Sequence, residues 1–281
     1  MRLERKRSAA LSAKERIVVV GFGNMGQALV RGWLAKGRDA SSIEVADPVA
    51  SARAVAANLG VAARDEVGAA GRAADVVVLA VKPNQLADVL PRCATLGGPG
   101  TVVLSIAAGK TIAEIGKGLR SDTPIVRAMP NTPAAIGQGM TVLVANAAVS
   151  RAQRALCSEL LAAVGSVAWL EDERHMDAVT AVSGSGPAYV FLLIECLEQA
   201  AVELGLDAAL AKHLALATVA GAGAYAADAL VGPAELRRRV TSPNGTTQAA
   251  LDVLMGQPGM RELLVRATRA AAQRSRELAL V

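Results

Sequence analysis

The chain has 281 residues, of which 52% are hydrophobic and 20% are charged, so it can bury a sizeable core and wholesale disorder is excluded. Aromatic residues make up only 2%, which argues against a stacking platform for single-stranded nucleic acid. The two His and three Cys never occur at the close spacings of metal ligands, so we predict no metal site.

The formal net charge of +5 does not lead us to predict a polyanionic partner. Part of the excess lies in the first 16 residues, and the rest is scattered apart from Arg237-Arg238-Arg239, as on an ordinary solvated surface. No stretch is predicted to reach the apolar length of a membrane span, and residues 187–206, which come closest, contain three Glu. Without a visible signal peptide or disulfide framework, we predict a cytoplasmic protein that binds neither membrane nor nucleic acid.

The first 170 or so residues alternate between strand-like and helix-like runs. Apolar runs bounded by charge, Gly or Pro predict strands over 17–20, 43–46, 75–81, 101–106 and 124–129, with weaker candidates over 140–144 and 167–170. Helices are predicted between them over 24–36, 50–59, 84–92, 111–119 and 150–163. This alternation predicts an α/β, Rossmann-type, doubly wound and mostly parallel sheet.

The pattern changes near residue 174, beyond which we predict no strand. Long Ala- and Leu-rich stretches predict helices over 187–204, 208–230, 246–255 and 259–279. The boundary between an α/β domain and an all-α domain is therefore placed between residues 174 and 175. Because small side chains permit close helix packing and some faces carry few charges, we predict that the helical half forms a dimer interface.

The strongest local signal is a GxGxxG turn that follows the first strand directly and opens a helix. Gly21 permits the tight turn, Gly23 lets the backbone approach a pyrophosphate, and Gly26 lets helix and strand pack closely. Free N–H groups at the start of the helix would face the phosphates. The strand, the turn and the helix together predict a dinucleotide-binding site.

The cofactor choice is left open by two residues near the end of the second strand. Asp47 lies 21 residues past Gly26 and can accept hydrogen bonds from an adenosine ribose, which favours NADH. Arg53 is close by in sequence and could accommodate the 2′-phosphate of NADPH. We therefore predict NADPH or NADH, with Asp47 favouring NADH.

Few side chains qualify as a catalytic acid or nucleophile. His175 and His213 lie in or beside helical stretches without an obvious Asp partner, so we interpret them as structural or surface residues. Lys82, at the end of the third strand, could contact the cofactor or act as an acid. The run 183–186 (SGSG) lacks the first Gly of a nucleophile elbow, and we interpret it as a turn and cap before the helix that contains Pro187.

A second informative loop, 240–247 (VTSPNGTT), is rich in turn and cap residues just before a predicted helix. Its N–H groups would form an anion site at the helix N-terminus, suited to a substrate carboxylate. The residues alone are equally compatible with an ordinary capped turn.

Together these segments resemble the Δ1-pyrroline-5-carboxylate reductase family, whose members make L-proline. The resemblance spans most of the chain, outside the first 15 residues, and rests on motifs that occur in the family's order: VVVGFGNMG (18–26), LAVKP (79–83), LSIAAG (104–109), RAMPNTPAAIGQG (127–139), DAVTAVSGSGPAYVF (177–191) and VTSPNGTT (240–247). It implies a basic N-terminal extension (1–15), a dinucleotide-binding Rossmann domain (16–174) and a helical dimerisation and substrate domain (175–281). It also implies a homodimer that assembles further into a ring such as a decamer.

The resemblance assigns roles to particular residues. The cofactor would contact Val20, Gly21, Phe22, Gly23, Asn24, Met25, Gly26, Asp47, Ala80, Val81, Lys82, Pro83, Ile106, Ala107, Ala108 and Asn131. The cyclic imine carboxylate would contact Ser242, Asn244, Gly245, Thr246 and Thr247, with the Thr247 hydroxyl near the ring nitrogen as the catalytic group. In the family this loop comes from the dimer partner. Asn244 replaces a common Gly, and Asn tolerates positive φ better than most residues.

The implied reaction is hydride transfer from NAD(P)H to the imine carbon of Δ1-pyrroline-5-carboxylate. The protonated imine is already electrophilic, so no strong side-chain acid is needed. One alternative is another Rossmann imine reductase or a reductase of the β-hydroxyacid dehydrogenase type. That type needs a Lys in the second half, where Lys212 stands alone without an Asn within the next turn. The other alternative is a non-enzymatic module that binds the dinucleotide.

Overall fold

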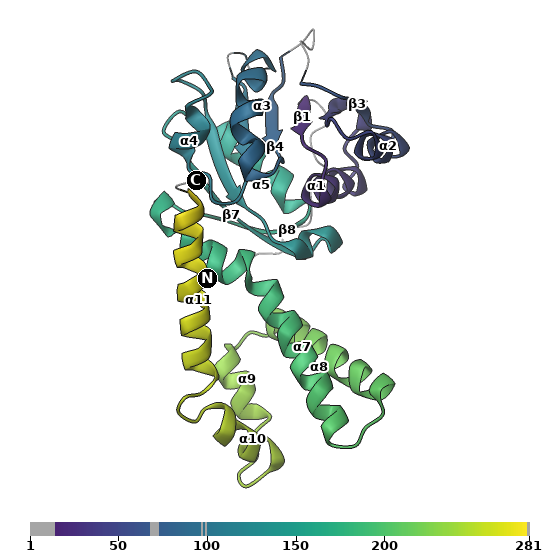
Figure 1. Cartoon of the computed structure of the whole chain (residues 1–281), viewed down its shortest axis with the longest axis vertical. Helices are drawn as coiled ribbons and strands as arrows, with labels where there is room; N and C mark the ends of the chain where they lie inside the picture. Colours follow the sequence, from purple (N-terminus) through teal and green to yellow (C-terminus); the bar gives the residue numbers. More distant parts are fainter. Residues whose placement is uncertain (1–14, 68–72, 97, 99, 280–281) are drawn as a thin grey trace. The chain divides into compact units, whose positions relative to one another are not determined.

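The computed structural model describes residues 15–67, 73–96, 98 and 100–279. The predicted N-terminal extension, except Glu15, lies outside these residues. The chain divides into two compact units (Figure 1). One comprises the described residues up to Gly184 together with those from Ala272 onward, and the other comprises Ser185–Ala271.

The first unit is built on one eight-stranded sheet in the order β3-β2-β1-β4-β5-β6-β7-β8. The strands are β1 (Ile17–Val20), β2 (Ile43–Ala46), β3 (Ala62–Arg64), β4 (Val76–Leu79), β5 (Val102–Ser105), β6 (Ile125–Met129), β7 (Gly139–Ala145) and β8 (Gly165–Trp169). Neighbouring strands are parallel except β6 and β7, which are antiparallel. This confirms the doubly wound, mostly parallel sheet, to which the structure adds β3.

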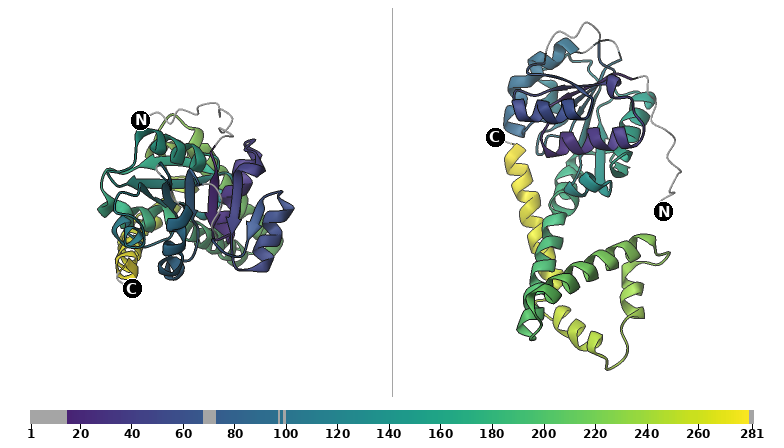
Figure 2. Two further views of the ribbon diagram at one scale, coloured as in Figure 1. Left: turned by 90° about the horizontal axis from the view of Figure 1, so that it is seen from above. Right: turned by 90° about the vertical axis from the view of Figure 1, so that its right-hand side faces the viewer.

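Helices cover both faces of this sheet. Successive residues of its central strands point to opposite sides, so their apolar side chains pack against helices on each face. Val19 belongs to a buried cluster with Leu29 and Trp33, whereas Val18 belongs to a second cluster with Leu90 and Ile115. The helices that supply these clusters are α1 (Asn24–Ala35), α2 (Ala50–Asn58), α3 (Leu86–Cys93), α4 (Ile112–Gly116) and α5 (Arg151–Ala162) (Figure 2). The predicted helix over 111–119 is thus shorter than expected.

The second unit contains α7 (Gly186–Glu203), α8 (Ala208–Asp228), α9 (Pro233–Arg239), α10 (Thr246–Leu254) and the greater part of α11 (Met260–Ala279). Beyond residue 175, the described part of the chain contains no strand, as predicted. A short helix α6 (Met176–Val179) and a π-helical turn Thr180–Gly184 precede α7. The first residues of the SGSG run, predicted as a turn, are therefore helical.

The helical unit leaves large apolar side chains uncovered. Phe191 and Leu192 of α7 are 57% and 58% exposed, and Leu216 of α8 is 52% exposed. The continuous helical run Glu173–Glu203 has the length and composition of a membrane span, and only 6% of the residues in its most apolar 18-residue stretch are buried. The prediction that no stretch reaches that length was wrong, because the helix begins 14 residues before Pro187. Length and composition alone are weak evidence for a membrane span, and an apolar helix face equally suits a protein partner.

Candidate cofactor cleft and substrate loop

The three glycines of the GxGxxG turn have different surroundings. Gly21 has φ +92°, and a Cβ there would lie 2.8 Å from the carbonyl carbon and oxygen of Ala80. A Cβ on Gly26 would lie 2.7 Å from the carbonyl oxygen of Gly21, whereas a Cβ on Gly23 would meet nothing within 4 Å. Protein packing therefore requires Gly at positions 21 and 26, while Gly23 borders open space of the kind that an approaching pyrophosphate would fill.

That open space belongs to a cleft of about 640 Å³ at the carboxyl ends of β1, β2 and β4. The sheet order reverses between β1 and β4, and ligands of doubly wound sheets bind at this point. The cleft brings together these predicted residues: Val20, Gly21, Phe22, Gly23, Asp47, Ala80, Val81 and Lys82. Several predicted residues are not among its described lining: Asn24, Met25, Gly26, Pro83, Ile106, Ala107, Ala108 and Asn131.

The cleft also has lining residues that sequence reasoning missed. Asp65 and Glu66 follow β3, and Ser51 lies in the first turn of α2. Gln27, Asp88 and Arg92 also line it. The acidic pair could not be placed beside the glycine turn, because β3 itself was not predicted.

Asp47 connects the glycine turn to the turn after β2. Asp47 is a buried residue, and its carboxylate accepts hydrogen bonds from the backbone N–H groups of Phe22 at 2.6 Å and Val49 at 2.8 Å. The Arg53 guanidinium donates to the backbone carbonyls of Asp47 at 2.9 Å and Pro48 at 2.8 Å. Asp47 therefore shapes the turn as well as lining the cleft, whereas Arg53 is not among the described lining residues.

The remaining predicted cofactor residues lie on neighbouring strands and loops. Ile106 follows β5, and its N–H donates to the carbonyl of Leu79 at 3.0 Å, which places the 106–108 segment beside the end of β4. Asn131 follows β6, and its side chain forms hydrogen bonds within the protein. Its Nδ2 donates to the carbonyl of Ser183 at 3.1 Å, and its Oδ1 accepts from the N–H of Met140 at 2.8 Å.

The loop at 240–247 forms a tight turn ahead of α10. Asn244 has φ +58°, so its backbone adopts the left-handed conformation that Asn was expected to tolerate there. The N–H of Gly245 donates to the carbonyl of Ser242 at 3.1 Å and is thus used within the turn. The N–H groups of Thr246 and Thr247 belong to the first turn of α10, where intrahelical acceptors are lacking. These two groups are the best placed to bind an anion.

Other candidate side chains offer little chemistry. His175 and His213 are exposed. Cys93 and Cys157 are buried, and burial raises the pKa of each thiol to about 12, which keeps both as neutral thiols at physiological pH. Lys82 follows β4 and lines the cleft. It is the basic residue closest in sequence to the carboxyl ends of the strands that form the cleft.

A glycine turn at the switch point of a sheet with the order 3-2-1-4-5-6 defines a Rossmann-type dinucleotide-dependent enzyme class. Residues 16–109 match a family model described as NADP oxidoreductase, coenzyme F420-dependent, and residues 173–278 match the pyrroline-5-carboxylate reductase dimerisation model. The pyrroline-5-carboxylate reductase of Pseudomonas aeruginosa is 46% identical over 265 residues, or 94% of this chain and 97% of that protein. The chain therefore belongs to the pyrroline-5-carboxylate reductase family.

Solved structures agree with this assignment. A pyrroline-5-carboxylate reductase from Coxiella burnetii has a TM-score of 0.90 and 38% identity, covering 94% of this chain and 98% of that one. A Plasmodium falciparum pyrroline carboxylate reductase with NADP bound has a TM-score of 0.82 and 27% identity, covering 95% and 99%. The similarity thus extends over both the sheet unit and the helical unit.

Proposed function

We propose that the cleft beside Gly23 holds the nicotinamide cofactor and that the loop before α10 holds the substrate carboxylate. The chain is an NAD(P)H-dependent pyrroline-5-carboxylate reductase, which reduces Δ1-pyrroline-5-carboxylate to L-proline. The observation that carries the cofactor assignment is the open space at Gly23, at the switch point of the sheet. A Cβ would fill that space without touching protein, so steric packing alone does not explain the Gly.

The substrate assignment rests on the N–H groups of Thr246 and Thr247. They would hold the carboxylate of the cyclic imine, with Ser242 and Asn244 shaping the turn. The Thr247 hydroxyl would orient the imine nitrogen and relay a proton from water. When bound, the cofactor supplies a hydride to C5 of the imine. Because the protonated imine is electrophilic, the protein needs to position the reactants rather than supply a strong acid.

Further features of the proposal concern assembly and location. Residues 16–174 would form the cofactor domain and 175–281 the dimerisation and substrate domain. The uncovered apolar residues of α7 and α8 would be covered by a second copy, and the substrate loop would enter the partner's site. Dimers would assemble into a ring such as a decamer, in the cytoplasm.

The test is an assay of NADH and NADPH oxidation with Δ1-pyrroline-5-carboxylate. Turnover that depends on both reactants and yields proline supports the proposal. NAD(P)H oxidation with a β-oxo acid, which is reduced to the β-hydroxyacid, but not with the imine would indicate the other reductase class. Cofactor binding without turnover of any cyclic imine would indicate a non-enzymatic module.

A further inference from the structure

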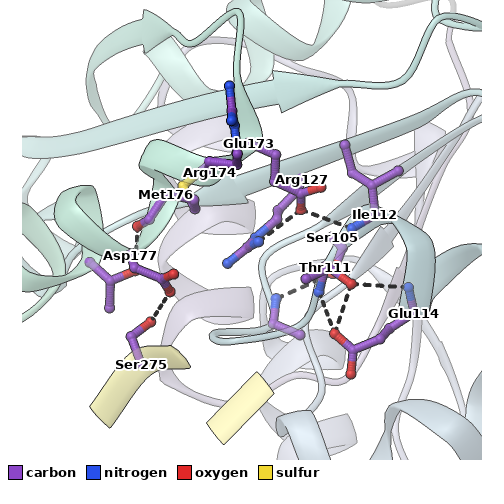
Figure 3. A network of polar contacts seen from close by, with 12 residues as sticks. Ser105, Thr111, Ile112, Glu114, Arg127, Glu173, Arg174, Met176, Asp177 and Ser275 are labelled. Atoms are coloured by element: carbon purple, nitrogen blue, oxygen red, sulfur yellow. Dashed lines mark hydrogen bonds and ion pairs between the residues drawn. The ribbon is translucent and has the colours of Figure 1, made fainter. Parts of the chain in front are cut away.

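Arg127 is a charged residue of the sheet whose side chain is buried. It lies in β6, between β5 and β7, with its side chain only 5% exposed. Its Nη1 lies 2.8 Å from Oε1 of Glu173, which comes from a segment 46 residues further along the chain (Figure 3). A buried guanidinium is costly unless it is paired, so this ion pair fixes where Glu173 lies.

The same oxygen of Glu173 makes a second contact. It accepts a hydrogen bond from the N–H of Ile112 at 2.9 Å, at the first residue of α4. The preceding residue, Thr111, caps that helix in a reciprocal arrangement with Glu114. The loop after β5 is thus bonded to Leu79 at its start, through the Ile106 N–H, and to Glu173 at its end.

The segment that carries Glu173 is also attached on another side. Oδ1 of Asp177 accepts a hydrogen bond from Oγ of Ser275 at 2.6 Å, and Ser275 is a buried residue of α11 (Figure 3). The segment 173–177 therefore bonds to β6 and α4 through Glu173 and to α11 through Asp177. Such attachments from two directions restrict how far Glu173 can move.

We propose that Glu173 is a positioning residue for the reductase reaction. Paired with Arg127, it holds the far end of the loop that contains residues 106–108, which the family resemblance assigns to the cofactor and which lies beside the end of β4. This inference rests on the proposed function of the chain as a reductase. A displacement of about 1 Å in a residue that positions reactants costs on the order of a hundredfold in rate, so loosening this anchor should affect catalysis more than overall cofactor affinity.

The test compares Glu173→Ala with Glu173→Gln and with a control at another ion pair. Gln keeps an acceptor for the Ile112 N–H but lacks the charge that pairs with Arg127. Glu44→Gln is the control, because Glu44 of β2 pairs with Arg16 at 2.7 Å and Arg64 at 2.8 Å, in the same sheet but away from this loop. We would measure kcat, KM and the NADH dissociation constant, together with hydrogen exchange at residues 106–112.

Glu173→Ala should lower kcat by about tenfold or more, change the NADH dissociation constant less than about threefold and speed exchange at Ile112. Glu173→Gln should lie between Ala and wild type, and Glu44→Gln should keep the wild-type kcat. If the wild type is active and both Glu173 variants keep its kcat and its exchange rate at Ile112, the inference is overturned but the proposed function is not. An equal loss of kcat in Glu44→Gln would also overturn it, because any weakened ion pair would then suffice.

If the wild type showed no turnover, the proposed function would fail and so would the positioning role of Glu173. If Glu173→Ala does not fold, Glu173→Gln decides: wild-type kcat and wild-type exchange at Ile112 in that variant contradict the inference, and a lowered kcat with faster exchange supports it.

Discussion

The carboxylate of Asp47 accepts a hydrogen bond from the backbone N–H of Phe22 across 2.6 Å, which joins the end of β2 to the glycine turn after β1. The other carboxylate oxygen accepts from the N–H of Val49. A residue predicted to contact the cofactor ribose therefore also sets the shape of the turn that would hold the pyrophosphate.

Replacing Asp47 should change both cofactor affinity and cofactor preference. Asp47→Ala leaves the buried N–H of Phe22 without its acceptor, which should cost about 1–3 kcal/mol of stability. It also removes the proposed acceptor for the adenosine ribose, so NADH binding should weaken by about tenfold. Asp47→Asn keeps an acceptor but removes the negative charge, so the ratio of kcat/KM for NADPH to that for NADH should rise. Steady-state kinetics with both cofactors measures this. A strong NADPH preference in the wild type would contradict the role assigned to Asp47.

Two glycine substitutions in the same turn should separate folding from binding. Gly23→Ala adds a Cβ in open space, so the midpoint of urea unfolding should stay near wild type while NADH affinity falls by about tenfold or more. Gly21→Ala forces a Cβ against the Ala80 carbonyl at positive φ, and should destabilise the fold by about 2 kcal/mol or more. Urea unfolding and a fluorescence titration with NADH distinguish the two. Unaltered binding by Gly23→Ala would show that the cofactor does not approach this residue.

The Thr247 hydroxyl should matter for turnover and little for the cofactor. Thr247→Ala removes the group that would orient the imine, and kcat should fall on the order of a hundredfold. Thr247→Ser keeps a hydroxyl and should retain most activity. Thr246→Ala is the matched control, because it keeps the backbone N–H groups of the same helix turn. Near-wild-type turnover in Thr247→Ala would rule out the proposed role.

The Glu114 capping box should make stability depend on pH. Burial opposes ionisation of Glu114, but hydrogen bonds from Thr111 and the nearby charge of Lys110 outweigh it and hold the pKa of Glu114 below its ordinary value of 4.5. Because the folded-state pKa is the lower one, the stabilisation is fully present above pH 4.5 and is lost as pH falls through the folded-state pKa.

Glu114→Gln isolates this charge, since Gln can also complete a capping box. The wild type should have the higher free energy of unfolding at neutral pH, and the difference should shrink as the pH falls below 4.5. Urea unfolding at a series of pH values measures it. A difference that does not vary with pH would indicate a packing effect instead.

Periodic apolar runs predicted most of the fold, because central strands such as β1 and β4 are buried on both faces and read as continuous β-branched segments. The edge strand β3 escaped prediction, since Ala62–Arg64 is short, partly exposed and without a β-branched residue. Helix α9 was not among the predicted helices, which left residues 231–239 without an element, although Pro233 suits the first turn of a helix.

In the candidate site, features set by short sequence motifs were predictable, whereas contacts between residues far apart in the chain were not. The glycine turn and the positive φ of Asn244 follow from short motifs that specify backbone conformation. The Arg127–Glu173 pair joins residues 46 positions apart, and nothing in either local sequence indicates the other. Prediction from local patterns therefore reached the residues at strand ends but not the contacts that hold those ends in place.

The uncovered apolar side chains of α7 and α8 have a consequence for how the chain must be handled. A helical unit with Phe191 and Leu192 more than half exposed depends on association to remove that surface from water. Association stabilises a folded chain by mass action, so the thermal midpoint of this reductase should rise with its own concentration. Dilution would then act as a denaturing condition, and a newly made chain would be most prone to aggregate before it meets its first partner.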